Sequence, residues 1–272
     1  MDCHDPRLPK KSFDLKTRAT LPIRMDVNNY RDYLSYRLHR PYGLYESFER
    51  EFFDLCRSAL LKYNFQVRIG DMDGIMIAYH NTAEIFGFQY LTRAEMDEIL
   101  YGNTATGDAV FKVVLKLYDH VLESIVDLYR NDEALKLTFS LNKDASKLTI
   151  FSEIEDQTGG ENNSSGNVEK SFHQFTLSIS NFINGFRSED ITLDPTGMDD
   201  WRVDSTLQQV KPNMAEYESA RKKVTEGRAR IDDGSDSGRV SVPIMRNARR
   251  IYPKGLMNTE EGPEILAPWT IL

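Results

Sequence analysis

The chain lacks the features that mark several large protein classes. It has only two cysteines, Cys3 and Cys56, and their spacing is not that of a zinc site. No apolar run reaches the roughly 18 to 20 residues that a membrane span requires. The GxxxxGK[ST], GxGxxG and GxSxG motifs of phosphate loops, dinucleotide sites and nucleophile elbows are also missing. These absences argue against a disulfide framework, and we expect no membrane span, no cofactor and no metal.

The start of the chain does not have the composition of a targeting segment. The first 24 residues contain no apolar stretch of the kind found in secretory signals. Asp2, Asp5 and Asp14 interrupt the basic residues that a transit peptide would need. With two cysteines that suggest reduced thiols, this predicts a cytoplasmic or nuclear protein.

The composition is that of a globular chain with unevenly distributed charge. Hydrophobic residues make up 40% and charged residues 28%, and the length fits one large domain or about two. The net charge of -8 is concentrated in residues 131–210, which hold 14 acidic and 6 basic side chains. Residues 211–255 have the opposite balance, with 11 basic and 6 acidic side chains. This pattern indicates an acidic body followed by a basic segment that contacts either the body or an anionic partner.

Three segments have the pattern of helices. Apolar residues recur at steps of three and four between about 45 and 63, which predicts an amphipathic helix. Between about 108 and 129 they occupy most sides, which predicts a long buried helix. Thr92 with Glu95 three residues later is a capping-box pattern and opens a short helix that Gly102 ends.

Other segments alternate with a period of two, as half-buried strands do. They lie at 65–69, 75–79, 85–90, 135–141, 148–151 and 175–179. Asp73-Gly74 is typical of a hairpin turn between the first two. We therefore expect an α+β fold, in which an antiparallel sheet of about five or more strands packs on the helices at about 108–129 and 45–63. An extended C-terminal tail follows this fold.

The composition also suggests where the domains lie. Residues 1–24 lack periodicity and are interpreted as an extended arm. Residues 25–186 form the predicted α+β domain, with a flexible loop at 157–170. Residues 187–272 are predicted to be a largely irregular tail, with a short helix near 214–227 and apolar contact motifs.

Two groups of titratable residues are candidates for an enzyme site. Carboxylates on a tight turn can bind a hard cation, and histidine can transfer protons. If Asp73-Gly74 is the turn, however, His80 lies roughly 20 Å away, at about 3.3 Å per strand residue. A histidine on a helix is also more often a hydrogen-bonded structural residue. The two candidate groups are Asp71, Asp73 and His80, and Asp119, His120 and Glu123.

The basic segment at 221–250 is a candidate for RNA contact. Arginine and lysine neutralise phosphates, although few aromatic residues lie nearby to stack on bases. Nucleic acid is therefore a possible partner that the sequence does not favour over a solvated helix. The candidate residues are Arg221, Lys222, Lys223, Arg246, Arg249 and Arg250.

The tail carries short apolar groups spaced along a polar chain. Such groups bind grooves or sheet edges of partner proteins, or else they pack on their own domain. We therefore interpret the chain as a non-catalytic adaptor, a eukaryotic complex subunit that binds an unidentified partner protein through its tail and a sheet edge. The enzyme and the RNA-binding subunit are the alternatives. The residues expected to bind the partner are Val242, Ile244, Ile251, Tyr252, Ile265, Leu266, Trp269, Ile271 and Leu272.

One short motif in the tail suggests modification. The stretch "DSGRVS" resembles the DSGxxS phosphodegron that an F-box ubiquitin-ligase subunit recognises. Phosphates on Ser237 and Ser241 would supply the charge that such a receptor binds. Arg239 departs from the apolar residue usual at its position.

Overall fold

The structure is a computed structural model of the whole chain. It describes residues 3–129, 134–142, 147–154, 172–189, 191, 193–194, 196–232 and 270–271. These residues divide into two compact units, and the boundary falls between Asp108 and Ala109. Unit 1 contains the described residues up to Asp108 together with 270–271, and unit 2 contains those from Ala109 to 232. The loop predicted at 157–170 lies outside the described residues.

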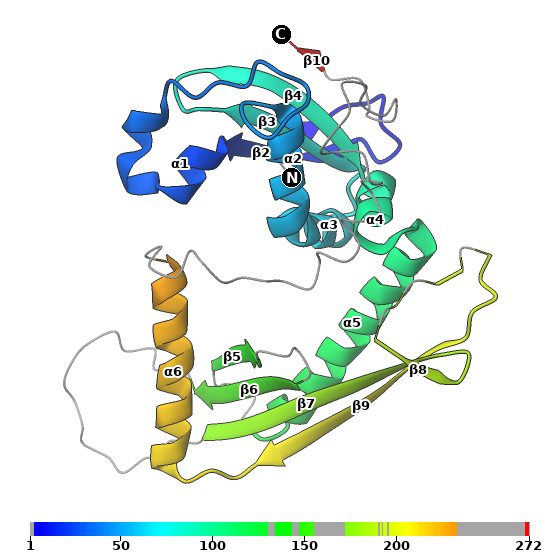
Figure 1. Cartoon of the computed structure of the whole chain (residues 1–272). Helices are drawn as coiled ribbons and strands as arrows, with labels where there is room; N and C mark the ends of the chain where they lie inside the picture. Colours follow the sequence, from blue (N-terminus) through cyan, green and yellow to red (C-terminus); the bar gives the residue numbers. More distant parts are fainter. Residues whose placement is uncertain are drawn as a thin grey trace. The chain divides into compact units, whose positions relative to one another are not determined.

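Unit 1 is built on a mixed five-stranded sheet (Figure 1). Strand β2 pairs with β3 in parallel, whereas the other neighbours pair antiparallel. Because parallel neighbours need a long crossover, the helices between β2 and β3 form that connection. The strands, in spatial order, are β1 (Cys3–His4), β2 (Ser12–Ala19), β3 (Gly74–His80), β4 (Ile85–Thr92) and β10 (Thr270–Ile271).

The helices of unit 1 bury one apolar cluster against the sheet. Phe52, Leu55 and Leu60 pack with Ile77 and Tyr79 in this core. The helices are α1 (Leu21–Met25), the 3-10 helix η1 (Val27–Tyr33), α2 (Phe48–Ser58), α3 (Leu60–Ile69) and α4 (Arg93–Tyr101). The capping box predicted for α4 is confirmed: Thr92 and Glu95 bond each other reciprocally, and Gly102 ends the helix with a φ of 86°.

The segment at 65–69 is helical, so the strand predicted there is wrong. It forms the last turn of α3, where Leu60, Asn64 and Val67 are buried at helical spacing. Gly74 is the first residue of β3, and Asp73-Gly74 therefore connects a helix to a strand. A Cβ atom on Gly74 would lie 2.3 Å from the Leu91 carbonyl oxygen. Close packing against β4 therefore requires a glycine at this position, and a hairpin turn is not needed to account for it.

Unit 2 contains a second, antiparallel sheet between two helices (Figure 1). Strands β5, β6 and β7 are adjacent, and both β8 and β9 pair with β7. The elements are α5 (Thr104–Val126), which begins in unit 1, β5 (Leu135–Leu141), β6 (Lys147–Ile154), β7 (Phe172–Ile183), β8 (Phe186–Ser188), β9 (Trp201–Val210) and α6 (Met214–Asp232).

The two helices of unit 2 cover opposite faces of its sheet. Ile150 belongs to the cluster that Val121 and Ile125 of α5 complete. The ring of the next residue, Phe151, meets Tyr217 of α6 with centroids 5.5 Å apart. Because neighbouring strand residues point to opposite faces, α5 and α6 lie on different sides.

The predicted α+β class is confirmed, with differences in detail. The strands form two sheets rather than one, and β2 introduces a parallel pair. The helix predicted at 45–63 is interrupted at Ala59. Helix α5 is buried along one side, at Val121 and Ile125, while Val114 and Tyr118 remain exposed. Among the described residues, no helix has the length and apolar character of a membrane span.

Candidate functional site

Strand β2 carries charged side chains in alternate positions on one face. Asp14, Lys16 and Arg18 follow each other at steps of two, and we call them the β2 charged row. Their partners on β3 are Ile75, Ile77 and Tyr79. Those three residues are fully buried under the helices, so the charged row borders the apolar core.

Lys16 is the more accessible part of a close ion pair. Its ammonium group contacts the Asp14 carboxylate, and the side chains keep 19% and 7% of their surface exposed. The same ammonium lies 4.9 Å from the centre of the Tyr63 ring on α3. The Lys16 ammonium is therefore held between a carboxylate and an aromatic face, with part of its side chain open to solvent.

Arg18 is almost fully buried and is tied to α2 through Glu51. Its Nε donates to the Glu51 carbonyl oxygen at 3.2 Å, and it lies 3.9 Å from Glu51 Oε2. Burial lowers the pKa of Arg18, and the charge of Arg24 lowers it further, whereas Glu51 acts in the opposite direction. Arg18 Nη2 has no hydrogen-bond partner among the described residues.

Glu51 holds local structure together and is not free for chemistry. Its carboxylate accepts from the Leu21 N–H at 2.6 Å and from Arg24 Nη2 at 2.5 Å. The side chain is completely buried. Glu51 therefore fixes the start of α1 and the end of β2 against α2, and Lys16 is the most exposed member of the row.

A second buried charge cluster joins α3, α4 and the start of α5. Asp97 accepts from Arg68 and from Asn64, both at 2.8 Å. Arg68 also donates to Asp108 at 2.5 Å. Arg68 and Asp97 keep at most 3% of their side-chain surface exposed. We interpret this cluster as a structural clamp because its charged groups pair with each other.

The structure does not bring Asp71, Asp73 and His80 together as a site. The Asp73 carboxylate accepts from the Lys10 N–H at 2.9 Å, which anchors the loop before β2. Asp71 pairs with the Lys10 ammonium at the surface. His80 ends β3 at its far side, and its Nδ1 accepts from the Thr82 N–H. Among the described residues, no three His, Cys, Asp or Glu side chains converge as a metal site.

The second enzyme candidate lies on the exposed side of α5. Asp119, His120 and Glu123 are all exposed. A nearby groove of about 400 Å³ between α5 and the sheet is not lined by any of them. That groove is apolar apart from Lys147. The three residues are therefore arranged like a solvated helix face.

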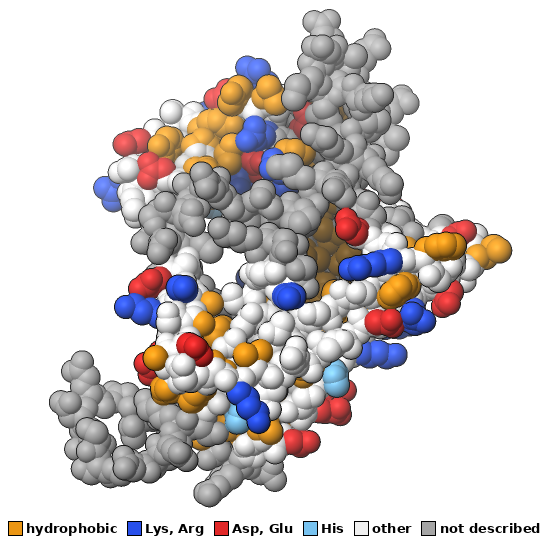
Figure 2. All heavy atoms as spheres, turned by 60° about the horizontal axis from the view of Figure 1, so that its bottom comes forward, with side chains coloured by type: hydrophobic (Ala, Val, Ile, Leu, Met, Phe, Trp, Pro, Cys, Tyr) orange, Lys and Arg blue, Asp and Glu red, His pale blue; other side chains and the backbone are white. Residues whose placement is uncertain are grey.

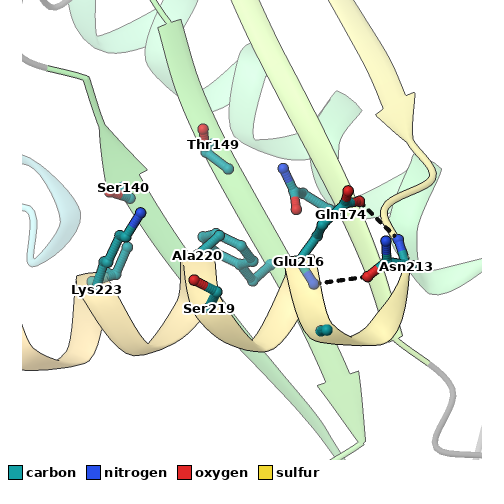
Figure 3. Close-up of a pocket in the computed structure, with 11 residues that line it drawn as sticks. Ser140, Thr149, Gln174, Asn213, Glu216, Ser219, Ala220 and Lys223 are labelled. Carbon is teal, nitrogen blue, oxygen red and sulfur yellow. Dashed lines mark hydrogen bonds between the residues drawn. The ribbon is translucent and has the colours of Figure 1, made fainter.

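The described part of the basic segment lies on α6. Arg221 pairs with Glu153 of the sheet, and Lys222 lies 3.8 Å from Glu226. Lys223 lines a cavity of about 650 Å³ between α6 and the sheet (Figure 3). The remaining basic candidates, Arg246, Arg249 and Arg250, lie outside the described residues.

Most of the predicted tail contacts also fall outside the described residues. This applies to Ser237 and Ser241 of the phosphodegron-like motif and to all of the apolar contact residues except Ile271. Ile271 belongs to β10, which pairs antiparallel with β4 opposite Gly87. These tail residues stay predictions.

The β2 charged row was missed because it lies in the stretch interpreted as an extended arm. The signal was present in "FDLKTRA", where charged residues alternate at every second position. Charged residues that alternate with Phe13, Leu15 and Thr17 resemble a strand whose charged face is solvated. Only the pairing of β2 with β3, which lies more than 50 residues further along the chain, makes it a buried strand.

The described residues define an α+β protein whose N-terminal unit holds a charged row at the edge of its core. The family described as mitochondrial protein Pet127 matches residues 1–123, which include the whole of β2 and α2. No solved structure matches the chain.

Two yeast proteins are similar to the chain. The "mRNA degradation protein pet127, mitochondrial" of Schizosaccharomyces pombe is 36% identical over 185 residues, which cover 67% of this chain and 35% of that protein. The "putative mitochondrial translation system component PET127" of Saccharomyces cerevisiae is 50% identical over 107 residues, which cover 38% of this chain and 13% of that protein. The chain thus matches about a third or less of the length of either relative.

These similarities contradict two predictions made from the sequence. The non-catalytic adaptor is wrong, because the relatives are named for mRNA degradation and for translation. The cytoplasmic or nuclear location is wrong, because both relatives and the family are described as mitochondrial. The adaptor prediction relied on missing catalytic motifs and on the apolar groups of the tail. The predicted location relied on the acidic residues among the first 24 and on cysteine usage, and cysteine usage distinguishes only oxidising from reducing compartments.

Proposed function

We propose that this chain acts on RNA in mitochondrial mRNA degradation, and that the β2 charged row contacts the phosphodiester backbone of the RNA. The observation that carries the proposal is the family match over residues 1–123, which contain the row. The name of the relative from Schizosaccharomyces pombe supports the RNA substrate. Under this proposal the partner is a single-stranded RNA whose phosphates contact cationic side chains of unit 1.

The chemistry of the row suits a phosphate. The Lys16 ammonium can donate to a non-bridging phosphate oxygen from its partly exposed position. Arg18 keeps only 7% of its side-chain surface exposed, so it adds positive charge behind Lys16 and makes no direct contact with the RNA. On the face shown in Figure 2, Lys and Arg side chains are interspersed with Asp and Glu among the coloured atoms.

RNA binding can be tested by fluorescence anisotropy with a labelled single-stranded RNA and the whole chain. Lys16→Gln should weaken binding roughly tenfold or more, because a charge-assisted hydrogen bond contributes about 1.5–3 kcal/mol. Lys10→Gln is the matched control, since Lys10 pairs with an exposed carboxylate on the surface of the same unit. Its effect should stay below about twofold, as for other exposed ion pairs. Wild-type protein that binds no RNA at low salt would refute the proposal.

A second candidate function is cleavage of the RNA at the same place. The observation that favours it is the Asp14–Lys16 pair, because a carboxylate next to a phosphate-binding cation can accept the proton of an attacking water. The water oxygen would form the new bond to phosphorus. The ester oxygen of the adjoining nucleotide would leave and take up a proton from solvent. Lys16 would stabilise the negative charge that develops on the phosphate.

The cleavage reaction predicts separate effects on binding and turnover. Asp14→Asn should lower the rate of RNA cleavage by at least about a hundredfold, the usual contribution of a general base. Binding of intact RNA should change by only a few fold, because Asn removes no cation. The reactions are run on labelled RNA with Mg²⁺ and with EDTA. An Asp14→Asn protein that cleaves at the wild-type rate would rule out this role for Asp14.

A further inference from the structure

The cavity between α6 and the sheet of unit 2 is open to solvent and is lined mostly by polar side chains. Its volume of about 650 Å³ lies in the roughly 300–1,000 Å³ range of small-molecule pockets. Ser140 of β5 lies opposite Thr149 of β6, and Phe151 of β6 lies opposite Gln174 of β7. These four side chains share one face of the sheet and form the floor of the cavity, which we call the α6 pocket.

Helix α6 is fixed beside the sheet in a way that leaves the pocket open. Tyr217 is buried between Phe151 and Phe172, and Arg221 pairs with Glu153, so one stripe of the helix is anchored. The neighbouring stripe presents small side chains to the pocket, Ala215, Ser219 and Ala220. Larger residues at these positions would fill the space. The anchoring stripe and the small stripe together maintain the cavity.

The polar groups of the pocket are not engaged by the described part of the protein. Ser140, Thr149 and Gln174 make no side-chain hydrogen bond with described residues, and neither do Ser219 or Lys223. Glu216 differs, because it forms a capping box with Asn213: its carboxylate accepts from the Asn213 N–H at 3.1 Å. Hydroxyl, amide and ammonium groups that line one cavity can together bind a polar ligand.

The charges of the pocket are separated along its length. Figure 3 shows Lys223 near Ser140 at one end, and Glu216 near Gln174 and Asn213 at the other. Lys223 is the single basic side chain among the lining residues. A phosphate fits the Lys223 end, because a hydroxyl and an ammonium can both donate to it. A group with hydrogen-bond donors, such as a ribose or a base edge, fits the Glu216 end.

We infer that the α6 pocket binds one nucleotide of an RNA strand, with its phosphate at Lys223 and its ribose or base at Gln174. This inference rests on the proposed action on RNA and adds a second contact in unit 2. The phosphate accepts from the Lys223 ammonium and from the Ser140 hydroxyl. Phe151 keeps only 3% of its surface exposed, so it forms the apolar base of the pocket beneath the sugar or base.

The test measures binding of a labelled oligouridylate RNA to the whole chain by anisotropy. Lys223→Gln should weaken binding about five- to tenfold and reduce the slope of log K against log salt by about 0.7, the value for one phosphate contact on a single strand. Lys222→Gln is the control, because it removes the same charge from the adjacent residue, which lies next to Glu226 outside the pocket. It should change the affinity by less than twofold.

A variant without a charge change tests the cavity itself. Ser219→Leu fills the small stripe and should weaken RNA binding as much as Lys223→Gln, with an unchanged melting temperature. If both variants bind RNA as the wild type does, the pocket inference is wrong while the proposed function stands. If the wild type binds no RNA, both are wrong. Free uridine monophosphate that competes as well as the oligonucleotide at equal nucleotide concentration would overturn the assignment to an RNA strand.

Discussion

The two units of the chain differ in how deeply their ion pairs are buried. In unit 1, Glu51 and Asp97 are completely buried, and each is held by at least one arginine. In unit 2, the Arg221–Glu153 pair keeps 35% and 21% of its side-chain surface exposed. Buried pairs require good geometry on every side, because an ion taken out of water loses several kcal/mol of solvation. Unit 1 therefore fixes its helices rigidly, whereas unit 2 leaves polar groups available beside α6.

This difference matches the roles proposed for the units. A site that performs chemistry needs side chains held in position, and the β2 charged row adjoins the Glu51 anchor. A site that only holds a nucleotide tolerates an open cavity with adaptable hydroxyl and amide groups. The comparison can be tested by replacing one charged residue in each unit and measuring the stability of both.

The largest effect is expected from Glu51→Gln. It keeps the shape of the side chain but leaves Arg18 buried without its carboxylate, which should cost about 3–5 kcal/mol. Glu153→Gln in unit 2 should cost at most about 1 kcal/mol, because its pair is partly exposed. Hydrogen exchange in denaturant, resolved by peptide, measures each unit separately. Equal losses for the two variants would contradict the comparison.

A smaller effect is expected from alanine at two helical glycines. A Cβ on Gly107 would lie 2.8 Å from Arg68 Nη2 and from Asp97 Oδ1, inside the structural clamp. Gly107→Ala should therefore destabilise unit 1 by about 1–3 kcal/mol. A Cβ on Gly227 of α6 meets nothing within 4 Å, so Gly227→Ala should stabilise the helix by up to about 1 kcal/mol. Thermal unfolding of both variants checks the opposite signs.

The buried Tyr217 side chain, which anchors α6 to the sheet, predicts that the stability of unit 2 depends on pH. The Tyr217 hydroxyl donates to the Ser152 carbonyl oxygen at 3.3 Å, and burial raises its pKa from 10.0 to about 12. A phenol whose pKa is raised by folding stabilises the fold below the unfolded pKa, and this contribution is lost as the pH rises from 10 towards 12. Tyr217→Phe should cost about 0.5–1.5 kcal/mol at neutral pH. The difference in the free energy of unfolding between wild type and Tyr217→Phe, measured by urea titration, should therefore become smaller above pH 10. A constant difference would show that the hydroxyl is not buried as described.

The last prediction needs no substitution and compares the reactivity of the two cysteines of unit 1. Burial raises the pKa of the Cys56 thiol to about 12, so its reactive thiolate is scarce near neutral pH. Cys3 is partly exposed. Alkylation of the folded protein at pH 8 should modify Cys3 and spare Cys56, whereas denatured protein should react at both. Mass spectrometry of the digested product reads this directly, and rapid labelling of Cys56 in the folded state would contradict its burial.

The sequence predicted local features well where a single turn or face determined them. Thr92 with Glu95 was expected to open a short helix, and both capping-box hydrogen bonds are present at the start of α4. The strands expected at 135–141 and 75–79 are present within β5 and β3. Each of these depends on residues that lie close together in the chain.

The sequence failed where long-range pairing decides the structure. Strand β9 was interpreted as part of an irregular tail, because most of its side chains are polar and exposed. It is a strand because it pairs along the length of β7. The boundary between the units falls within α5, where no change in composition marks it. The candidate site was missed for the same reason, since the β2 charged row is buried only by its pairing with β3.

The central claim is that RNA contacts both β2 and α6. The most direct measurement is photocrosslinking of a single-stranded RNA that contains 4-thiouridine to the whole chain, with the linked peptides identified by mass spectrometry. Crosslinks should concentrate in peptides that contain residues 12–19 and 214–227, and Lys223→Gln should reduce only those in the second. Crosslinks that are absent, or that fall only outside these two segments, would contradict the account.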